Sequence, residues 1–271
     1  MEACRSVSAL TRRDSSSSII IVSVHPRASL SRDPREPSER SDRINDGFDM
    51  SAAAAAAPAL RLQYFNIEGP AEKIRLTLSI AKIPFRDDRV AFEDWPSVKP
   101  TTPYGQLPVM YVDDEAMAQS DAILRYCGRL AGLYDEQRAR EIDEAVSLVE
   151  DMRESWYPNL AVGMVPEKYN LEKGSDAHAA TTKAMRERWI REELPRYCGF
   201  ISKRVAGGKF LCGDRVTIAD CALVPLLRRF RSGGIDHVPK ECLDAFADVV
   251  AYYEKFHAIP EVAAWYAAKS A

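Results

Sequence analysis

The sequence has few residues of the kinds that build metal sites and disulfide frameworks. Only four histidines occur in 271 residues, and no two have the spacing of metal ligands. The six cysteines are scattered and none lies in a CxxC pair, which favours free thiols in a reducing compartment. The sequence therefore predicts neither a metal site nor a disulfide framework.

Long apolar runs and a strong charge of one sign are also missing. No run approaches the roughly 20 apolar residues that a membrane-spanning helix needs, so membrane insertion is not expected. The formal net charge of −3 gives no electrostatic reason to bind nucleic acid or an anionic membrane. The 46% of hydrophobic residues is enough for one or two packed cores in an ordinary globular protein.

The beginning of the chain differs from the rest. Residues 1–32 are rich in Ser and Arg and poor in acids, as in an organelle transit peptide, and a mixed-charge stretch typical of disorder follows. Met50 then opens an alanine tract and could itself be the true start. We assign residues 1–58 to a disordered or targeting extension. We expect a cytoplasmic protein, or a plastid or mitochondrial one if residues 1–50 are a transit peptide.

From Leu60 the pattern predicts a small α/β domain, residues 59–132. An alternating stretch reads as a strand, and Gly69 can take the turn that follows it. Pro70 suits the first position of the next helix, where its missing N–H is no loss. Residues 85–91 form a second strand, parallel to the first if the crossover has the usual hand.

The rest of this domain is predicted as a loop containing Trp95, a hairpin and a helix. The hairpin turns at Asp113 and Asp114, and the helix spans residues 120–132 with Ser120 as its N-cap. After this β-α-β, β-β-α unit, only helical periodicity is found, which predicts an all-helical domain over residues 138–271.

Three short motifs lie at predicted element boundaries. Pro108 at the start of a strand indicates an edge position, or a cis Leu107–Pro108 bond that would turn the Leu107 amide and carbonyl outward. Gln119 and Ser120 precede a helix whose free N–H groups could hold a carboxylate as well as an ordinary cap. Thr217-x-x-Asp220 is typical of a capping box with a structural role.

Together these segments resemble the cytosolic glutathione transferases, most closely their sigma-like class. The resemblance covers roughly residues 60–271. It implies a thioredoxin-like N-terminal domain that binds glutathione, followed by a helical domain that supplies most of the acceptor pocket. It also makes the cis Leu107–Pro108 bond the expected form. The segments that carry it are YFNIEGPAE (64–72), DWP (94–96) with Lys99, PYGQLP (103–108), QSDAILRY (119–126), FLCGDRVTIAD (210–220) and HAIPEVAAW (257–265).

The family's catalytic tyrosine falls on Tyr64, at the end of the first strand. The resemblance implies that its hydroxyl donates a hydrogen bond to the sulfur of glutathione. A thiol of pKa about 8.5 is mostly protonated at neutral pH, and each unit of depression corresponds to about 1.4 kcal/mol. The alternative is that Tyr64 is only an aromatic side chain packed in the strand.

The same resemblance assigns the other contacts to glutathione. Trp95, Lys99 and Gln106 would hold its glycine end, although Trp95 could also anchor the loop and Lys99 could be a solvated charge. Leu107, before Pro108, would pair through its backbone with the cysteinyl unit, and Gln119 with Ser120 would grip the γ-glutamyl carboxylate. Asp151 is the candidate acid that reaches the γ-glutamyl amine of a dimer partner, or else a solvated helix charge.

One position departs from the family pattern. Pro70 stands where many sigma-like sequences carry Arg, so a cation beside the thiolate is missing, and an inward-pointing Glu68 would oppose the thiolate. The resemblance places the near wall of the acceptor pocket at Ile67, Gly69 and Pro70. Met152, Trp156, Tyr157 and Met164 are candidates for the far wall, although such positions on a helix are more often core.

The sequence is therefore interpreted as a homodimeric glutathione S-transferase. It would conjugate glutathione to electrophilic apolar small molecules without a metal. One alternative is a glutathione-dependent isomerase of the prostaglandin-synthase type, in which glutathione is not consumed. Another is a non-catalytic glutathione-binding or structural protein.

Overall fold

The computed structural model describes residues 58–270, with side chains to residue 268. The extension predicted at residues 1–58 lies almost entirely outside the described residues. All the described residues belong to one compact unit.

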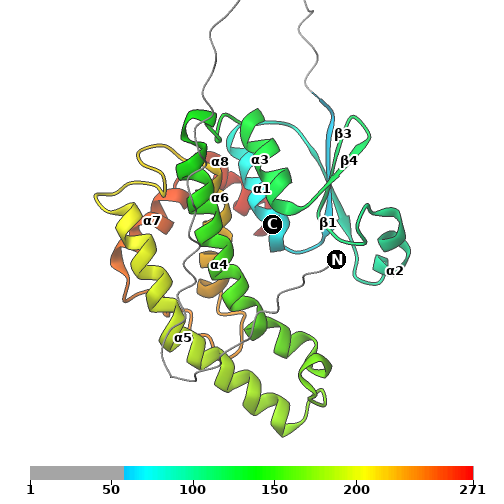
Figure 1. Cartoon of the computed structure of the whole chain (residues 1–271), viewed down its shortest axis with the longest axis vertical. Helices are drawn as coiled ribbons and strands as arrows, with labels where there is room; N and C mark the ends of the chain where they lie inside the picture. The colour runs from blue at the N-terminus through cyan, green and yellow to red at the C-terminus, as the bar shows by residue number, and fades with distance from the viewer. Residues whose placement is uncertain (1–57, 271) are drawn as a thin grey trace, which may run out of the picture. The chain divides into compact units, whose positions relative to one another are not determined.

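A mixed four-stranded sheet of order β2-β1-β3-β4 forms the first half of the fold (Figure 1). β1 (Leu60–Phe65) pairs in parallel with β2 (Arg86–Val90), as predicted from the crossover rule. β3 (Val109–Val112) pairs antiparallel with β1 and with β4 (Glu115–Ala118), and the hairpin turns at the predicted aspartates. Alternate residues of β1 are buried, so its period-two pattern marks the face turned to the core.

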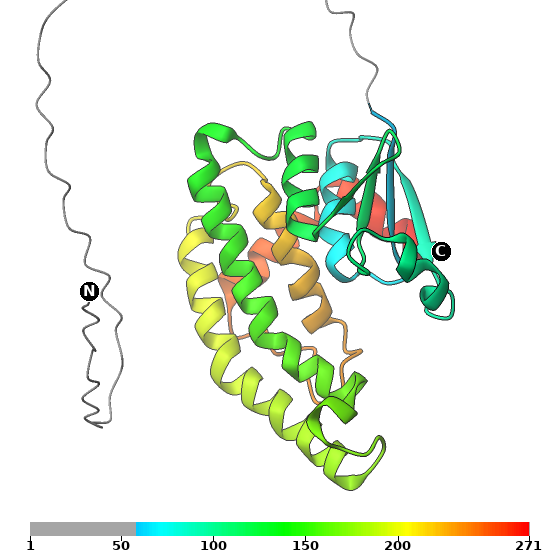
Figure 2. The ribbon, with the colours of Figure 1, turned by 45° about the vertical axis from the view of Figure 1, so that its right-hand side comes forward.

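Helices α1 (Glu72–Ile80) and α3 (Ser120–Leu130) lie between the sheet and the helical bundle (Figure 2). A short 3₁₀ helix, η1 (Gly69–Ala71), leads into α1 and carries Pro70 in its first turn. The predicted loop around Trp95 is instead the short helix α2 (Trp95–Val98), continued by η2 (Lys99–Thr101). A Pro residue in the first turn of each favours these two short helices.

The predicted N-cap of α3 is wrong by one residue. Gln119 takes the capping position with a φ of +71°, and Ser120 is the first helical residue. The Gln119 side chain accepts no hydrogen bond from the first turn, so it does not cap the helix. The predicted cis Leu107–Pro108 bond is confirmed.

The second half of the fold is helical, as the periodicity predicted. Its long helices α4 and α5 run side by side in Figures 1 and 2 and pack against each other. The capping box of Thr217 and Asp220 at the start of α6 is confirmed. The helices are η3 (Glu136–Arg138), α4 (Ala139–Met164), η4 (Pro166–Tyr169), α5 (Asp176–Val205), α6 (Ile218–Arg231), α7 (Ala247–His257) and α8 (Pro260–Ser270).

The two halves share one hydrophobic core. α1 packs against α6 and α8, and its apolar residues Ile74, Leu76 and Leu78 are completely buried. The Trp265 indole on α8 donates to a carboxylate oxygen of Glu72 on α1 at 2.8 Å. The helical domain is therefore fixed directly to the helix that follows the Tyr64 turn.

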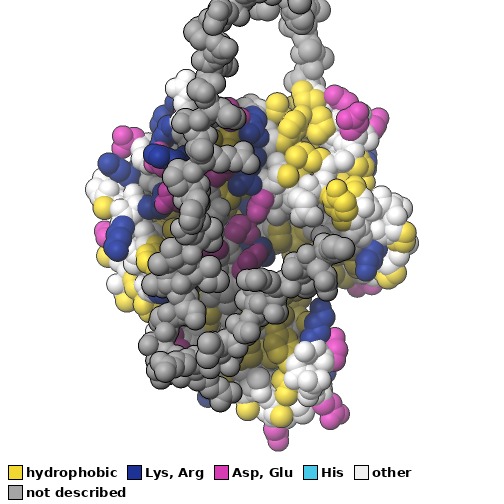
Figure 3. All heavy atoms as spheres, viewed as in Figure 1, with side chains coloured by type: hydrophobic (Ala, Val, Ile, Leu, Met, Phe, Trp, Pro, Cys, Tyr) yellow, Lys and Arg dark blue, Asp and Glu magenta, His cyan; other side chains and the backbone are white. Residues whose placement is uncertain are grey.

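The surface agrees with the near-neutral composition. Figure 3 shows basic and acidic side chains interspersed, with hydrophobic side chains between them, on the face that it draws. Within residues 58–270, no helix is both long and apolar enough to cross a membrane.

Candidate active site

The strand register brings the predicted glutathione residues to one end of the sheet. Gln63 of β1 pairs with Val109 of β3, which in turn pairs with Ala118 of β4. The adjacent residues, Tyr64 within β1, Pro108 before β3 and Gln119 after β4, therefore lie at the same end of the sheet. β2 ends beside Phe65 and leads to α2 at this edge as well.

The Tyr64 side chain is buried against the turn that follows β1. Only 6% of the residue is exposed. Gly69 in this turn has a φ of +45°, and a Cβ added there would lie 2.4 Å from the Tyr64 hydroxyl oxygen. Glycine is required for this close approach, since any other side chain would displace the hydroxyl. The hydroxyl is thus enclosed by the turn and is not a remote part of the core.

The Tyr64 hydroxyl is a proton donor at neutral pH. Burial raises the pKa of Tyr64 to about 12, although the positive charges of Arg75 and Arg153 act in the opposite direction. A phenol with this pKa keeps its proton throughout the physiological range. It can donate a hydrogen bond to an anionic sulfur without losing its proton.

A buried arginine on α1 holds the turn around Tyr64. The Arg75 guanidinium is completely buried and donates to the carbonyl oxygens of Ile67 at 3.0 Å and Glu68 at 3.1 Å. It also pairs with Glu72 at 3.1 Å, which compensates its charge. The guanidinium carbon lies 5.7 Å from the centre of the Tyr64 ring. Arg75 therefore fixes the backbone that faces the hydroxyl.

The predicted glycine-end residues lie on and after α2. The half-buried Trp95 ring packs edge to face on Phe65, with ring centres 5.3 Å apart. Lys99 and Gln106 are exposed, so their polar ends are open to a ligand. A Cβ at Gly105 would lie 3.3 Å from the Lys99 side chain, so the loop packs closely along the lysine stem.

The corner formed by Gln119 and Ser120 opens α3 and is linked to α4 by charges. The Lys73 ammonium, with 5% of its side chain exposed, pairs with Asp121 in the first turn of α3 and with Glu150 of α4 at 2.8 Å. Glu150 also accepts from the Arg153 guanidinium at 2.5 Å. A chain of alternating charges therefore runs from the first turn of α3 to Arg153 on α4.

The structure separates the predicted residues of α4 into two groups. Met152 and Trp156 are each 1% exposed, and Trp156 packs on the rings of Trp189 and Phe230, so both belong to the core. The prediction that they form an open wall of a pocket is therefore wrong, because their sides of the helix face other helices.

The other α4 residues predicted for the site are exposed. Tyr157 is 56% and Met164 is 68% exposed. Asp151 is also exposed, and it borders a groove between α4 and α5 together with Phe200 on α5. The charges that act on the pKa of Tyr64 come from Arg75 and Arg153, and Asp151 of the same chain is not among them.

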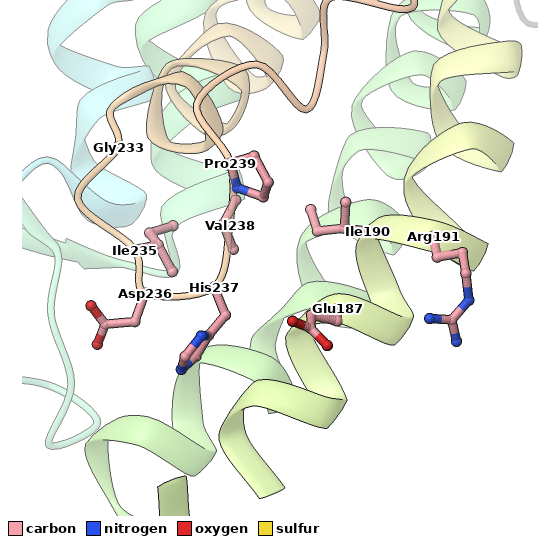
Figure 4. Close-up of a pocket in the computed structure, with 9 residues that line it drawn as sticks. All are labelled: Glu187, Ile190, Arg191, Gly233, Ile235, Asp236, His237, Val238 and Pro239. Carbon is pink, nitrogen blue, oxygen red and sulfur yellow. The ribbon is translucent and has the colours of Figure 1, made fainter. Parts of the chain in front are cut away.

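A separate hollow lies between α5 and the loop after α6 (Figure 4). It is lined by three residues of α5, including Glu187, and by Gly233 and residues 235–239, including Asp236 and His237. None of the predicted site residues lines it. Within residues 58–270, no group of three or more His, Cys, Asp or Glu side chains is arranged to hold a metal ion.

Sequence reasoning missed the two cations that act on Tyr64, Arg75 and Arg153, and the cation that pairs with Glu68, Arg228. Arg75 could have been suspected because it interrupts the apolar positions 74 and 76 on a buried helix. Arg153 and Arg228 carry no local signal, since each lies on a helix of the distant domain. Arg228 on α6 donates to Glu68, 160 positions earlier in the chain, at 3.1 Å.

Comparison with known families supports the same assignment in both halves of the fold. Residues 70–130 match the description "Glutathione S-transferase, N-terminal domain", and residues 173–269 match "Glutathione S-transferase, C-terminal domain".

Individual relatives extend the match over most of their length. Glutathione S-transferase 1 of Ascaris suum is 31% identical over 212 residues, which cover 78% of this chain and 96% of the relative. The class-mu 28 kDa glutathione S-transferase of Schistosoma bovis is 33% identical and covers 66% of this chain and 78% of its own.

A solved structure adds a match in three dimensions. That of prostaglandin synthase D of Nilaparvata lugens has a TM-score of 0.63 and 31% identity, and covers 77% of this chain and 96% of its own. With both domain matches, these relatives show that the chain belongs to the glutathione S-transferase family and is a transferase whose substrate is glutathione.

Proposed function

We propose that Tyr64 activates the thiol of glutathione and that the chain conjugates the resulting thiolate to electrophilic apolar small molecules. The observation that carries this proposal is the Tyr64 hydroxyl, which is buried beside Gly69 at the end of the sheet that Pro108 and Gln119 also reach. Burial raises the pKa of Tyr64 to about 12, so the hydroxyl keeps its proton. A fixed donor stabilises the thiolate more than the thiol, so it lowers the thiol pKa. Binding both substrates together supplies the remaining rate enhancement.

The residues around Tyr64 support an extended orientation of the tripeptide along the sheet end. Trp95, Lys99 and Gln106 hold the glycine carboxylate, and Leu107 pairs with the cysteinyl backbone next to Pro108. Gln119, Ser120 and the N-terminus of α3 hold the γ-glutamyl carboxylate, which the helix dipole favours. The Lys73 ammonium compensates Asp121 in the same turn.

The acceptor substrate lies on the open side of the Tyr64 turn in this proposal. Ile67, which is 44% exposed, forms the near wall with Gly69 and Pro70. The exposed Tyr157 and Met164 of α4 supply the far wall in place of the buried core residues. Tyr157 follows Arg153 by one helical turn, so both lie on the same face of α4. The charge of Arg153 acts on the pKa of Tyr64, so this face of α4 is turned towards Tyr64.

The decisive experiment measures the thiol pKa of bound glutathione from its ultraviolet thiolate absorbance. Wild type is expected to depress it by at least about one unit from 8.5, and Tyr64→Phe to restore it. Tyr111→Phe is the matched control, because its hydroxyl lies on β3 and contacts Gln63. An unshifted thiol in saturated wild type would overturn the proposal.

A glutathione-dependent isomerase is the second candidate. The observation in its favour is the structural likeness to a prostaglandin synthase D. It would use the same thiolate and release it unchanged after opening a lipid endoperoxide. Consumption of one glutathione per turnover indicates conjugation, and turnover without consumption indicates isomerisation. The sigma-like class remains part of the proposal and rests on the sequence segments that resemble it.

We also propose a homodimer in which Asp151 serves the partner's site. The exposure of Asp151 on the α4–α5 groove supports this, because it is free to meet a second chain. Asp151→Asn should then raise the KM for glutathione, whereas Glu154→Gln, an exposed neighbour, should not. Elution as a monomer at micromolar concentration would count against the dimer.

We also propose the domain boundaries and the subcellular location of the protein. Residues 59–132 would form the glutathione-binding domain and residues 138–271 the helical domain. Residues 1–58 would be an extension of a cytoplasmic or organellar protein. The N-terminal residue found by mass spectrometry in cells distinguishes a cleaved transit peptide from a start at Met50.

A further inference from the structure

A single carboxylate on β2 joins two arginines beside the turn that follows β1. Asp87 accepts through Oδ1 from Nε of Arg75 at 3.0 Å and through Oδ2 from Nε of Arg89 at 2.8 Å. Arg75 lies on α1 and Arg89 on β2, so Asp87 connects the helix with the sheet. The carboxylate therefore fixes the two guanidinium groups relative to each other.

Both arginines donate to the same carbonyl oxygen of the turn. The Arg75 guanidinium reaches the Ile67 oxygen at 3.0 Å, and the Arg89 guanidinium reaches it at 3.4 Å. Together with the Asp87 carboxylate, these hydrogen bonds close a ring. Hydrogen bonds from charged donors are stronger than those from neutral ones, so the ring holds the Ile67 carbonyl from two sides.

The turn that this ring holds is the one that packs against the Tyr64 hydroxyl. Ile67 lies two residues before Gly69, whose Cβ position is 2.4 Å from the hydroxyl oxygen. The Arg75 guanidinium carbon lies 5.7 Å from the centre of the Tyr64 ring, and Arg89 is the strand partner of Tyr64 in the β1–β2 pair. A displacement of the ring would therefore change the position of the hydroxyl.

The next residue of β2 offers a comparison. The side chain of Asp88 is 19% exposed and that of Asp87 is 20% exposed. Asp88 also pairs with two arginines, Arg61 and Arg86. Successive residues of a strand point to opposite faces, so Asp88 lies on the other face of the sheet. In the described part of the chain, its arginines donate to Asp88 and to no atom of the turn after β1.

We propose that Asp87 is a positioning residue of the active site, which holds the turn after β1 against the Tyr64 hydroxyl by way of Arg75 and Arg89. This inference rests on the proposed function, since it concerns the thiolate that Tyr64 stabilises. Asp87 does not touch glutathione in this role. It acts through the two arginines and the Ile67 carbonyl.

The direction of the expected effect separates positioning from simple electrostatics. Asp87 is an acid, so the loss of its negative charge alone would favour a nearby thiolate and lower the thiol pKa. Loss of the ring instead frees the Tyr64 hydroxyl to move away from the sulfur, which weakens the hydrogen bond and raises the thiol pKa. A raised thiol pKa after removal of this carboxylate is therefore explained by geometry and not by charge.

The test compares Asp87→Asn with Asp88→Asn in the full chain, with chlorodinitrobenzene as the electrophile. Asp87→Asn should raise the pKa of the bound thiol by roughly half a unit and lower kcat about tenfold. The KM for glutathione should stay within about twofold, since the groups proposed to bind the peptide lie on other segments. Asp88→Asn is the matched control and should leave the thiol pKa and kcat at their wild-type values.

The outcomes distinguish this inference from the proposed function. A depressed wild-type thiol pKa that is unchanged or lower in Asp87→Asn would overturn the role of Asp87 and leave Tyr64 activation intact. Equal rises in Asp87→Asn and Asp88→Asn would also contradict the inference, because only one of these residues belongs to the ring. An undepressed wild-type value would overturn the proposed function.

A second variant decides if Asp87→Asn does not fold. Arg89→Met removes one donor to the Ile67 carbonyl, from a side chain that is 26% exposed. It should lower kcat even at a pH above the thiol pKa, where the thiol is already ionised and a change of charge no longer alters the amount of thiolate. An unchanged kcat in that range would overturn the inference.

Discussion

Gly69 is the residue on which the geometry of Tyr64 depends most directly. Gly69→Ala would place a methyl group 2.4 Å from the Tyr64 hydroxyl oxygen, so the hydroxyl or the turn must move. We expect kcat/KM to fall between about tenfold and about a hundredfold, as for a displaced catalytic group. Gly132→Ala is the control, because Gly132 also has positive φ but no atom within 4 Å of its Cβ position. An equal loss in both variants would attribute the effect to backbone strain.

The pKa of Tyr64 also predicts how kcat/KM depends on pH. Its pKa of about 12 means that the donor form persists well above pH 10. The kcat/KM for conjugation should therefore rise with ionisation of the thiol and then remain level, without a decline near pH 10. In Tyr64→Phe the rise should move towards the pKa of a free thiol, about 8.5. A decline in wild type that the phenylalanine variant lacks would show that Tyr64 ionises earlier.

Some features of single residues were predicted from the sequence and others were missed. The turn at Gly69 follows from a motif of a few adjacent residues, and the cis Leu107–Pro108 bond was expected from the family resemblance. The pairing of Glu68 with Arg228 spans 160 positions, so no local pattern contains it. The Gln119 φ of +71° was missed because serine is the commoner N-cap and glutamine rarely adopts positive φ.

At the scale of elements, Lys73 joins three helices through buried charge. Its ammonium pairs with Asp121 of α3 and Glu150 of α4 and is almost inaccessible. Lys73→Met should lower the free energy of unfolding by about 2 kcal/mol, since it leaves the partly solvated Asp121 without its cation and leaves Glu150 paired with Arg153 alone. Urea titration measures this change. Lys82→Met, which breaks an exposed pair with Glu261, should leave the urea midpoint unchanged.

Elements were predicted where hydrophobic periodicity is strong and missed where it is short. The four strands and the long helices α4 to α7 were found from their period of two or 3.6 residues. α2 was read as a loop because four residues do not complete two helical turns. Trp156 was placed at a pocket wall because periodicity marks a buried face without saying whether a helix or a ligand covers it.

At the scale of the whole molecule, the described residues supply a complete family fold. A chain that begins at Met50 should therefore melt within about 2 °C of the full chain, equivalent to less than about 1 kcal/mol. Its affinity for glutathione should also be unchanged. Thermal denaturation and glutathione titration of the two forms measure both quantities. A clear loss in the shorter form would show that the first 49 residues contribute to the folded domain.

The hydrogen bond from Trp265 to Glu72 has a consequence for biosynthesis. It joins residues 193 positions apart, so Glu72 leaves the ribosome long before Trp265. Glu72 is completely buried in the finished protein, and α1 packs on α8. During translation the surface of α1 that packs on α8 therefore stays exposed until α8 has been synthesised. Chaperone binding to nascent chains should therefore persist until α8 emerges, and stalling before it should leave the chain open to proteolysis.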